Sequence, residues 1–163
     1  MLGISTDVLR EAREELENIK GTRIMKTVGF FDLTGSTQIK LDKGHTLGRK
    51  AALLHNLICR KIVTKHKGSV VKEFGDGVLV DFDDPVFACL AAIEIKNAIH
   101  NTEKIFTKAG LTIGVLEEIE ISGARDILGA TVDRCARIQS AAISGQILID
   151  SALHDVVYSF LKD

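Results

Sequence analysis

The chain lacks several features that would place it in a specialised class of protein. It has one proline, no tryptophan and three cysteines among 163 residues. Its 21 basic and 22 acidic residues nearly cancel, which gives no electrostatic footprint for nucleic acid or an anionic membrane. No apolar run approaches the roughly 20 residues of a membrane helix, and no signal-peptide pattern is present. We therefore expect a cytoplasmic protein that binds neither nucleic acid nor membrane.

The few cysteines exclude a disulfide framework and a zinc site. Cys59, Cys89 and Cys135 show no CxxC spacing and stand among apolar or helical neighbours, which is typical of reduced, buried thiols. Apolar residues make up 45% of the chain, enough for a core that needs no cross-links.

Hydrophobic periodicity predicts an alternating order of strands and helices. We expect helices over 5–20, 45–66, 85–100, 131–142 and 151–160, strands over 24–33, 69–74, 78–82, 110–116 and 146–150, and a loop over 122–128. Asp83 or Asp84 is the expected cap of the third helix. The order strand, helix, two strands, helix, strand indicates a ferredoxin-like βαββαβ core. The predicted fold class is α+β, with a mainly antiparallel sheet and flanking helices, divided into an N-terminal helix over 1–22 and a domain over 23–163.

The long helix over 45–66 carries the clearest apolar periodicity. We expect its buried stripe to consist of Leu47, Ala51, Leu54, Ile58 and Ile62. His55 and His66 lie on the same helix, and we expect them at the surface rather than in a metal site.

An acidic residue closes the first predicted strand. Asp32 follows an apolar run, and the Gly-Ser-Thr turn of 35–37 comes soon after it. A buried strand rarely ends in an aspartate without a partner for the charge, and the main-chain N–H groups of such a turn can hold phosphate oxygens. Alternatively, Asp32 caps the turn and Ser36 or Thr37 caps a short helix.

A second aspartate, Asp76, lies in the Gly-Asp-Gly turn between the strands over 69–74 and 78–82. Such a turn is also what a tight hairpin requires. In a split βαβ core the first strand and this hairpin are neighbours, so Asp32 and Asp76 could lie side by side. Two adjacent carboxylates without His or Cys favour a hard cation such as Mg²⁺ or Mn²⁺.

A third segment runs from Asp126 to Arg137. Asp133 and Arg137 are four residues apart on a predicted helix and share a face. On its own, this pair fits an ordinary intrahelical ion pair.

Taken together, the three segments resemble the class III nucleotide cyclases, which include adenylate and guanylate cyclases. The segments that carry the resemblance are Phe31 to Thr37, Lys72 to Gly77, Asp126 to Gly129 with Val132 and Arg137, and Gly145 to Ile149. The resemblance covers residues 26–150 and implies the catalytic domain of such a cyclase. That domain converts a nucleoside triphosphate into a 3′,5′-cyclic nucleotide and pyrophosphate, and it works as a homodimer with composite sites.

The resemblance also implies a role for each matching residue. Asp32, Asp76 and the Leu33 main chain would hold two Mg²⁺ or Mn²⁺ ions, and Thr34 and Gly35 would help to hold the triphosphate. The second chain would supply Lys72 and Asp126 to the base, and Asp133 and Arg137 to the sugar and the transferring phosphoryl group. The family usually has asparagine where Asp133 stands, which weakens the transfer of that role.

The base-reading pair leaves the substrate open. A lysine donor and an aspartate acceptor fit adenine, cytosine and uracil, and argue against guanine. The stretches 108–114 and 132–138 resemble the bacterial antiphage (Pycsar) pyrimidine cyclases, which favours UTP or CTP as substrate and a cyclic product read by a separate effector. The alternatives are an adenylate cyclase and a cyclase-like domain that binds nucleotide without turnover.

Overall fold

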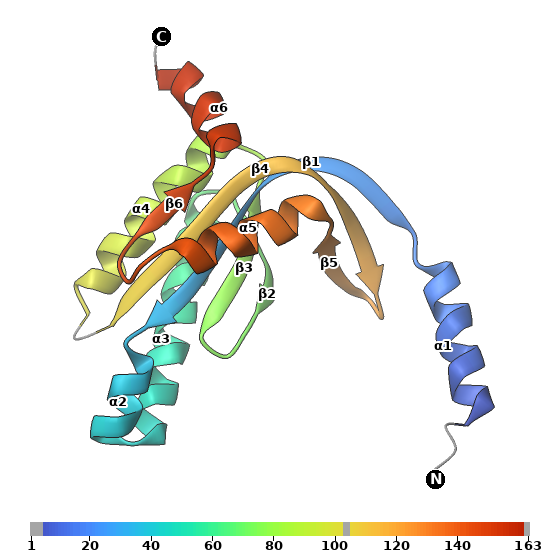
Figure 1. The fold of residues 1–163 in the computed structure, drawn as a ribbon, viewed down its shortest axis with the longest axis horizontal. Helices are drawn as coiled ribbons and strands as arrows, with labels where there is room; N and C mark the ends of the chain where they lie inside the picture. Colours follow the sequence, from blue (N-terminus) through green and yellow to red (C-terminus); the bar gives the residue numbers. More distant parts are fainter. Residues whose placement is uncertain (1–4, 103–104, 162–163) are drawn as a thin grey trace.

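The computed structural model describes residues 5–102 and 105–161, and the strands in these ranges form one six-stranded sheet (Figure 1). The strand order is β2-β3-β1-β4-β5, and β6 pairs with β4. The β4–β6 pair is parallel and the other pairs are antiparallel. Along the chain the elements are α1 (Thr6–Asn18), β1 (Gly21–Thr34), α2 (Ser36–Lys43), α3 (His45–Lys65), β2 (Ser69–Glu73), β3 (Gly77–Phe82), α4 (Pro85–His100), β4 (Phe106–Ile121), β5 (Ala124–Leu128), α5 (Ala130–Ala141), β6 (Ile147–Ile149) and α6 (Ser151–Leu161).

The central strand β1 buries both of its faces because alternate side chains point to opposite sides of a sheet. Phe31 and Leu33 join the larger core with side chains of α3 and α4. Val28 and Phe30 join a smaller core that includes Cys135 of α5. The sheet is thus covered by α3 and α4 on one face and by α5 on the other, whereas α1 extends away from it (Figure 1).

The predicted α+β fold with a ferredoxin-like core is confirmed. The strands β1, β2, β3 and β4 and the helices α3 and α4 follow the expected βαββαβ order. Asp84 caps α4 as one of the two expected candidates, since its carboxylate accepts hydrogen bonds from the N–H groups of Val86 and Phe87.

The expected loop over 122–128 is wrong. β4 reaches Ile121, and β5 turns back to pair with it after a turn at Ser122 and Gly123, both of which have positive φ. A Ser-Gly pair between apolar residues is a signal for a tight hairpin, because glycine adopts this backbone conformation without steric cost.

The expected buried stripe of α3 is also partly wrong. Leu47 and Leu54 are 43% and 44% exposed. The buried face of α3 is rotated toward the next residue in each turn and consists of Gly48, Ala52, His55, Asn56, Cys59, Ile62 and Val63. His55 is therefore fully buried rather than at the surface, while His66 is partly exposed and lies 2.7 Å from Glu94 Oε2.

The cysteines are free thiols, as expected. Cys59 and Cys135 are buried, whereas Cys89 is only half-buried. Burial raises the pKa of Cys135 to about 12, which keeps this thiol protonated at neutral pH.

Asp84→Ala should lower the free energy of unfolding by about 1 kcal/mol, because two N–H groups at the start of α4 lose their acceptor. Asp84→Asn is the matched control, since asparagine caps helices about as well as aspartate. Urea unfolding followed by circular dichroism measures both. Equal loss in the two variants would contradict the capping role.

Candidate active site

Two aspartates meet where β1 ends. Asp32 pairs with Gly77 of β3 on one side and with Lys108 of β4 on the other. The N–H of Leu33 donates to the main-chain oxygen of Asp76 at 2.8 Å. The hairpin between β2 and β3 therefore sits directly against the end of β1, and the expected juxtaposition of Asp32 and Asp76 is present.

The surroundings of Asp32 make its negative charge unfavourable. Burial raises the pKa of its carboxyl group, and the charge of Asp76 raises it further. Three contacts lower this pKa without cancelling the rise. They are the charge of Lys108, a long hydrogen bond of 3.4 Å from Gln139 Nε2, and a hydrogen bond from the Leu33 N–H. A half-buried carboxylate beside a second acid, with only weak compensation, is an environment that a bound cation would stabilise.

The donor set fits Mg²⁺ or Mn²⁺, which prefer oxygen ligands. Within the described ranges, no cluster of three or more His, Cys, Asp or Glu side chains could hold a metal. Two carboxylates are nevertheless enough for Mg²⁺, because this ion usually keeps several waters and also binds substrate phosphates.

The turn after β1 leads straight into α2. Gly35 has φ +88°, in the left-handed region that favours glycine, and no side chain caps the first N–H groups of α2. Thr34 Oγ1 lies 2.5 Å from Ser144 Oγ, which ties this turn to the segment before β6. A short helix does begin here, but the expected alternative that Ser36 or Thr37 caps it is wrong, because Gly35 is the N-cap and Ser36 is the buried first residue of α2.

Lys72 and Asp126 form an ion pair, with 2.6 Å between Nζ and Oδ2. Lys72 belongs to β2 and Asp126 to β5, which are the two ends of the strand order. The sheet curves strongly (Figure 1), which brings these ends together. Burial raises the pKa of Asp126, but the hydrogen bonds from Lys72 and from the Ile127 N–H outweigh it, so the pKa lies below its ordinary value.

Asp133 and Arg137 lie on the exposed face of α5. The structure shows no ion pair between them, nor any hydrogen bond from either side chain to another described residue. Gln139, two residues after Arg137, reaches Asp32. Because positions two apart on a helix point in nearly opposite directions, Arg137 faces away from the aspartates of its own chain.

Two neighbours of Asp32, Gln139 and Lys108, are not among the site residues predicted from the sequence. The register of β1 with β4 identifies Lys108, and the packing of α5 on the sheet identifies Gln139. Neither residue belongs to a local motif around Asp32, so only the three-dimensional arrangement reveals them.

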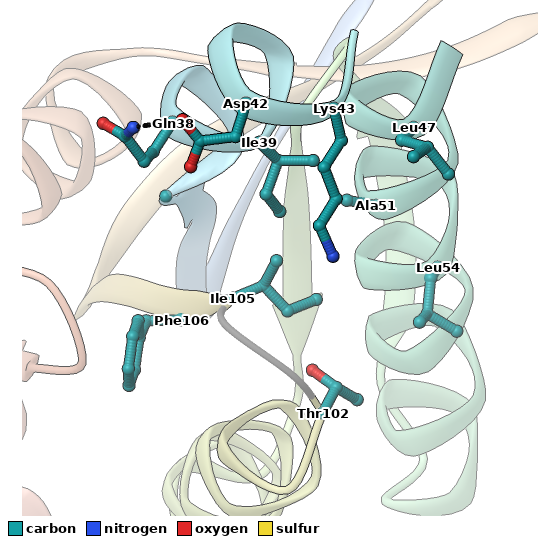
Figure 2. A pocket seen from close by; sticks show the side chains of 11 residues that line it. Gln38, Ile39, Asp42, Lys43, Leu47, Ala51, Leu54, Thr102, Ile105 and Phe106 are labelled. Atoms are coloured by element: carbon teal, nitrogen blue, oxygen red, sulfur yellow. Dashed lines mark hydrogen bonds between the residues drawn. The ribbon is translucent and has the colours of Figure 1, made fainter. Parts of the chain in front are cut away.

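Two cavities border α2. One, of about 410 Å³, is lined by Gly75 and Asp76 together with the basic residues Lys40 and Arg49. The other, of about 350 Å³, lies between α2, α3 and the start of β4 (Figure 2). Its walls are largely apolar and include neither Asp32 nor Asp76, so only the first cavity adjoins the carboxylate pair.

Comparisons with known proteins give two sequence relatives, although no protein-family model matches the chain. The chain is 32% identical over 108 residues, 62% of its length, to a Rhizobium meliloti (strain 1021) protein named "Putative adenylate cyclase 3". It is 27% identical over 154 residues, 92% of its length, to a protein named "Adenylate cyclase" from Glutamicibacter nicotianae. The chain spans only 18% and 37% of the lengths of these two relatives.

A solved structure shares the architecture. It is a double mutant of the guanylyl cyclase domain of the RhoGC fusion protein from the aquatic fungus Blastocladiella emersonii, with a TM-score of 0.79 at 23% identity, covering 86% of this chain and 87% of that one. The chain has the fold of a nucleotide cyclase catalytic domain. The cyclase fold and the two alignments together support a class III nucleotide cyclase. They do not separate one base from another, because the relatives are named adenylate cyclases and the structural neighbour is a guanylyl cyclase domain.

None of the helices in the described part of this cyclase fold is both long and apolar enough to cross a membrane.

Asp32→Asn should raise the free energy of unfolding at neutral pH in the absence of divalent metal. The pKa of Asp32 is raised in the folded state, so its contribution to stability is fully present below the unfolded value and is lost as the pH rises through the folded value. The advantage of the variant should therefore vanish as the pH falls below the ordinary value of 3.8.

Urea unfolding in EDTA across this pH range measures the effect. Asp133→Asn is the control, because Asp133 is exposed and should show no such gain. Equal stability of Asp32→Asn and wild type at neutral pH would contradict the electrostatic account of the site.

Proposed function

We propose that this chain is a nucleotide cyclase that converts a nucleoside triphosphate into a 3′,5′-cyclic nucleotide and pyrophosphate. The observation that carries the proposal is the pair Asp32 and Asp76, held together where β1 meets the β2–β3 hairpin. In the reaction, the ribose 3′-oxygen bonds to the α-phosphorus and loses its proton. The bond from the α-phosphorus to the bridging oxygen breaks, and pyrophosphate leaves.

The residues at the end of β1 suit the metal and the triphosphate. Asp32, Asp76 and the main-chain oxygen of Leu33 would hold two Mg²⁺ or Mn²⁺ ions. When bound, these cations would lower the pKa of the 3′-hydroxyl and screen the phosphate oxygens. Thr34 and Gly35 open the turn into α2, whose uncapped N–H groups favour an anion. Lys40 and Arg49 line the adjoining cavity and give its wall positive charge.

A second copy of the chain would complete each site. Arg137 and Asp133 face away from the aspartates of their own chain, so they reach a carboxylate pair only if it belongs to a partner. We therefore infer a homodimer in which one protomer supplies Asp32 and Asp76. Its partner supplies Arg137, which stabilises charge on the transferring phosphoryl group, and Asp133, which contacts the sugar.

The base would lie against Lys72 and Asp126 of the partner. Their ion pair keeps a donor and an acceptor side by side, and these are the two kinds of group that a base edge with one acceptor and one donor needs. Uracil and cytosine are our first choice, with an antiphage signalling role in which a separate effector reads the cyclic product. Adenine is the second choice, since the same pair fits its edge and the curated relatives are named adenylate cyclases.

A non-catalytic nucleotide-binding domain is the alternative from another class. The intact carboxylate pair speaks against it, because side-by-side acids are costly unless a cation is bound between them. Turnover of any nucleoside triphosphate that depends on Mg²⁺ or Mn²⁺ separates the two functions.

Asp32→Ala and Arg137→Ala should each be nearly inactive alone, with a loss of about 10³-fold or more for Arg137→Ala. An equal mixture should recover up to about a quarter of the wild-type activity, because half of randomly formed dimers are hybrids and each hybrid keeps one complete site. Activity is measured after the mixed subunits have been allowed to exchange. The control mixture of Asp32→Ala with Asp76→Ala should stay inactive, since both substitutions damage the same half. Recovery in the control, or none in the test mixture, would contradict the composite site.

A competition among all four nucleoside triphosphates, with products separated by chromatography, tests the base. We expect cyclic UMP as the main product, with CTP as the next substrate. A shallow pocket would exclude the second ring of a purine, since overfilling a packed site costs roughly 1–3 kcal/mol. Lys72→Ala with Asp126→Ala should lower activity with UTP and CTP while purines stay poor substrates, since exclusion of the second ring does not depend on these two side chains. Cyclic AMP as the dominant product would replace the first choice by the second.

A further inference from the structure

A buried polar network lies beneath the carboxylate pair. His55 and Asn56 are 0% and 6% exposed and belong to the buried residues of α3. His55 Nε2 lies 3.1 Å from Thr107 Oγ1, and Thr107 Oγ1 lies 3.3 Å from the main-chain oxygen of Asp32. On the other side, His55 Nδ1 lies 3.0 Å from Asn56 Oδ1.

Asn56 continues the network to the hairpin. Its Nδ2 donates to the main-chain oxygen of Phe74 at 3.0 Å. Phe74 is two residues before Asp76 and closes the hairpin, since its N–H donates to the oxygen of Gly77. The network therefore connects the two main-chain segments that carry Asp32 and Asp76.

The donors in this network can be assigned. The Phe74 carbonyl only accepts, so Asn56 turns its nitrogen to Phe74 and its oxygen to His55. His55 must then carry its proton on Nδ1. Burial lowers the pKa of His55, which keeps the ring neutral and leaves Nε2 as an acceptor. The single hydroxyl proton of Thr107 is shared between His55 Nε2 and the oxygen of Asp32.

The stability of the fold alone does not explain a polar network in the core. Polar side chains in an apolar interior gain little net stability, and replacing both partners by apolar groups of similar shape can be nearly neutral. The neighbouring carboxylate pair gives a reason for the network. Asp32 and Asp76 repel each other before a cation binds, and this repulsion opposes the close approach of the hairpin to the end of β1.

We propose that His55 and Asn56 are positioning residues that hold the hairpin against β1, so that Asp32 and Asp76 stay close enough to share divalent cations. The proposal rests on the metal assignment of the proposed function. Neither residue contacts substrate, and their effect passes through the main chains of Phe74 and Asp32. Their loss should therefore weaken metal binding more than nucleotide binding.

The test compares wild type with the double variant His55→Leu and Asn56→Leu, which removes both partners of their shared hydrogen bond. We expect Mn²⁺ alone, titrated into metal-free protein by calorimetry, to bind about tenfold more weakly or worse, in line with the effect of residues that orient metal ligands. The Mn²⁺ concentration for half-maximal turnover should rise by a similar factor. KM for the nucleotide at saturating Mn²⁺ should change little.

Val63→Ala is the matched control, because Val63 is a fully buried side chain on the same helix that has no part in the network. It should lower the thermal midpoint and leave Mn²⁺ affinity unchanged. His55→Gln, which replaces the imidazole by an amide that can still hydrogen-bond, should lose less Mn²⁺ affinity than His55→Leu.

The outcomes separate the two proposals. Weaker Mn²⁺ binding in the double variant but not in Val63→Ala supports the positioning role, even if no triphosphate is turned over and the proposed function fails. Wild-type Mn²⁺ affinity in the double variant would overturn the positioning role while leaving the cyclase function intact. An equal loss in Val63→Ala would also overturn it, because a general loss of stability would then explain the effect.

Discussion

The repulsion between Asp32 and Asp76 is the constraint around which the site is arranged. The ladder between β1 and β3 fixes Asp32 opposite Gly77, so Asp76, one residue earlier, must lie beside it. Burial and the neighbouring acid both raise the pKa of Asp32. The fold therefore places a charge where it is unfavourable in the absence of a cation, which is a common way for functional sites to give up stability.

Curvature of the sheet brings Lys72 and Asp126 together. In a flat sheet β2 and β5 would lie at opposite edges with three strands between them. The curved β1 and β4 instead let Lys72 reach Asp126, and let Arg125 pair with Asp81. The position of the Lys72–Asp126 pair thus depends on the shape of the whole sheet, whereas that of the two aspartates Asp32 and Asp76 depends on one local register.

Features that depend on a few adjacent residues can be predicted from the sequence, whereas those that depend on the shape of the whole sheet cannot. Asp84 and the turn around Asp76 are local signals, because a cap and a hairpin each depend on a few adjacent residues. The hairpin at Ser122 and Gly123 carries such a signal too, although a loop is predicted there.

Other features have no local signal. His55 is buried while its neighbour Leu54 is 44% exposed, so helical periodicity alone assigns the wrong face of α3. The buried side chain of His55 has two polar partners, Thr107 of β4 and Asn56 of the same helix. Gln139 is 107 residues from Asp32 along the chain, and only the packing of α5 on the sheet brings the two together.

Within the described chain, Lys72 and Asp126 form an ion pair whereas Asp133 and Arg137 do not, and this difference bears on how a substrate would be bound. Asp133 and Arg137 have the favourable order for a helical ion pair, yet forming it would gain only about 0.3–0.5 kcal/mol. In the proposed dimer, Arg137 would therefore give up almost nothing on turning to the substrate of the partner chain. Lys72 and Asp126 would instead have to exchange their contact for hydrogen bonds to the base, which would offset part of the energy gained. Arg137 would then contribute its full interaction to the phosphoryl group, and the edge of the base would contribute modestly. Selection among bases would then depend on the shape of the pocket more than on the two side chains that read the edge.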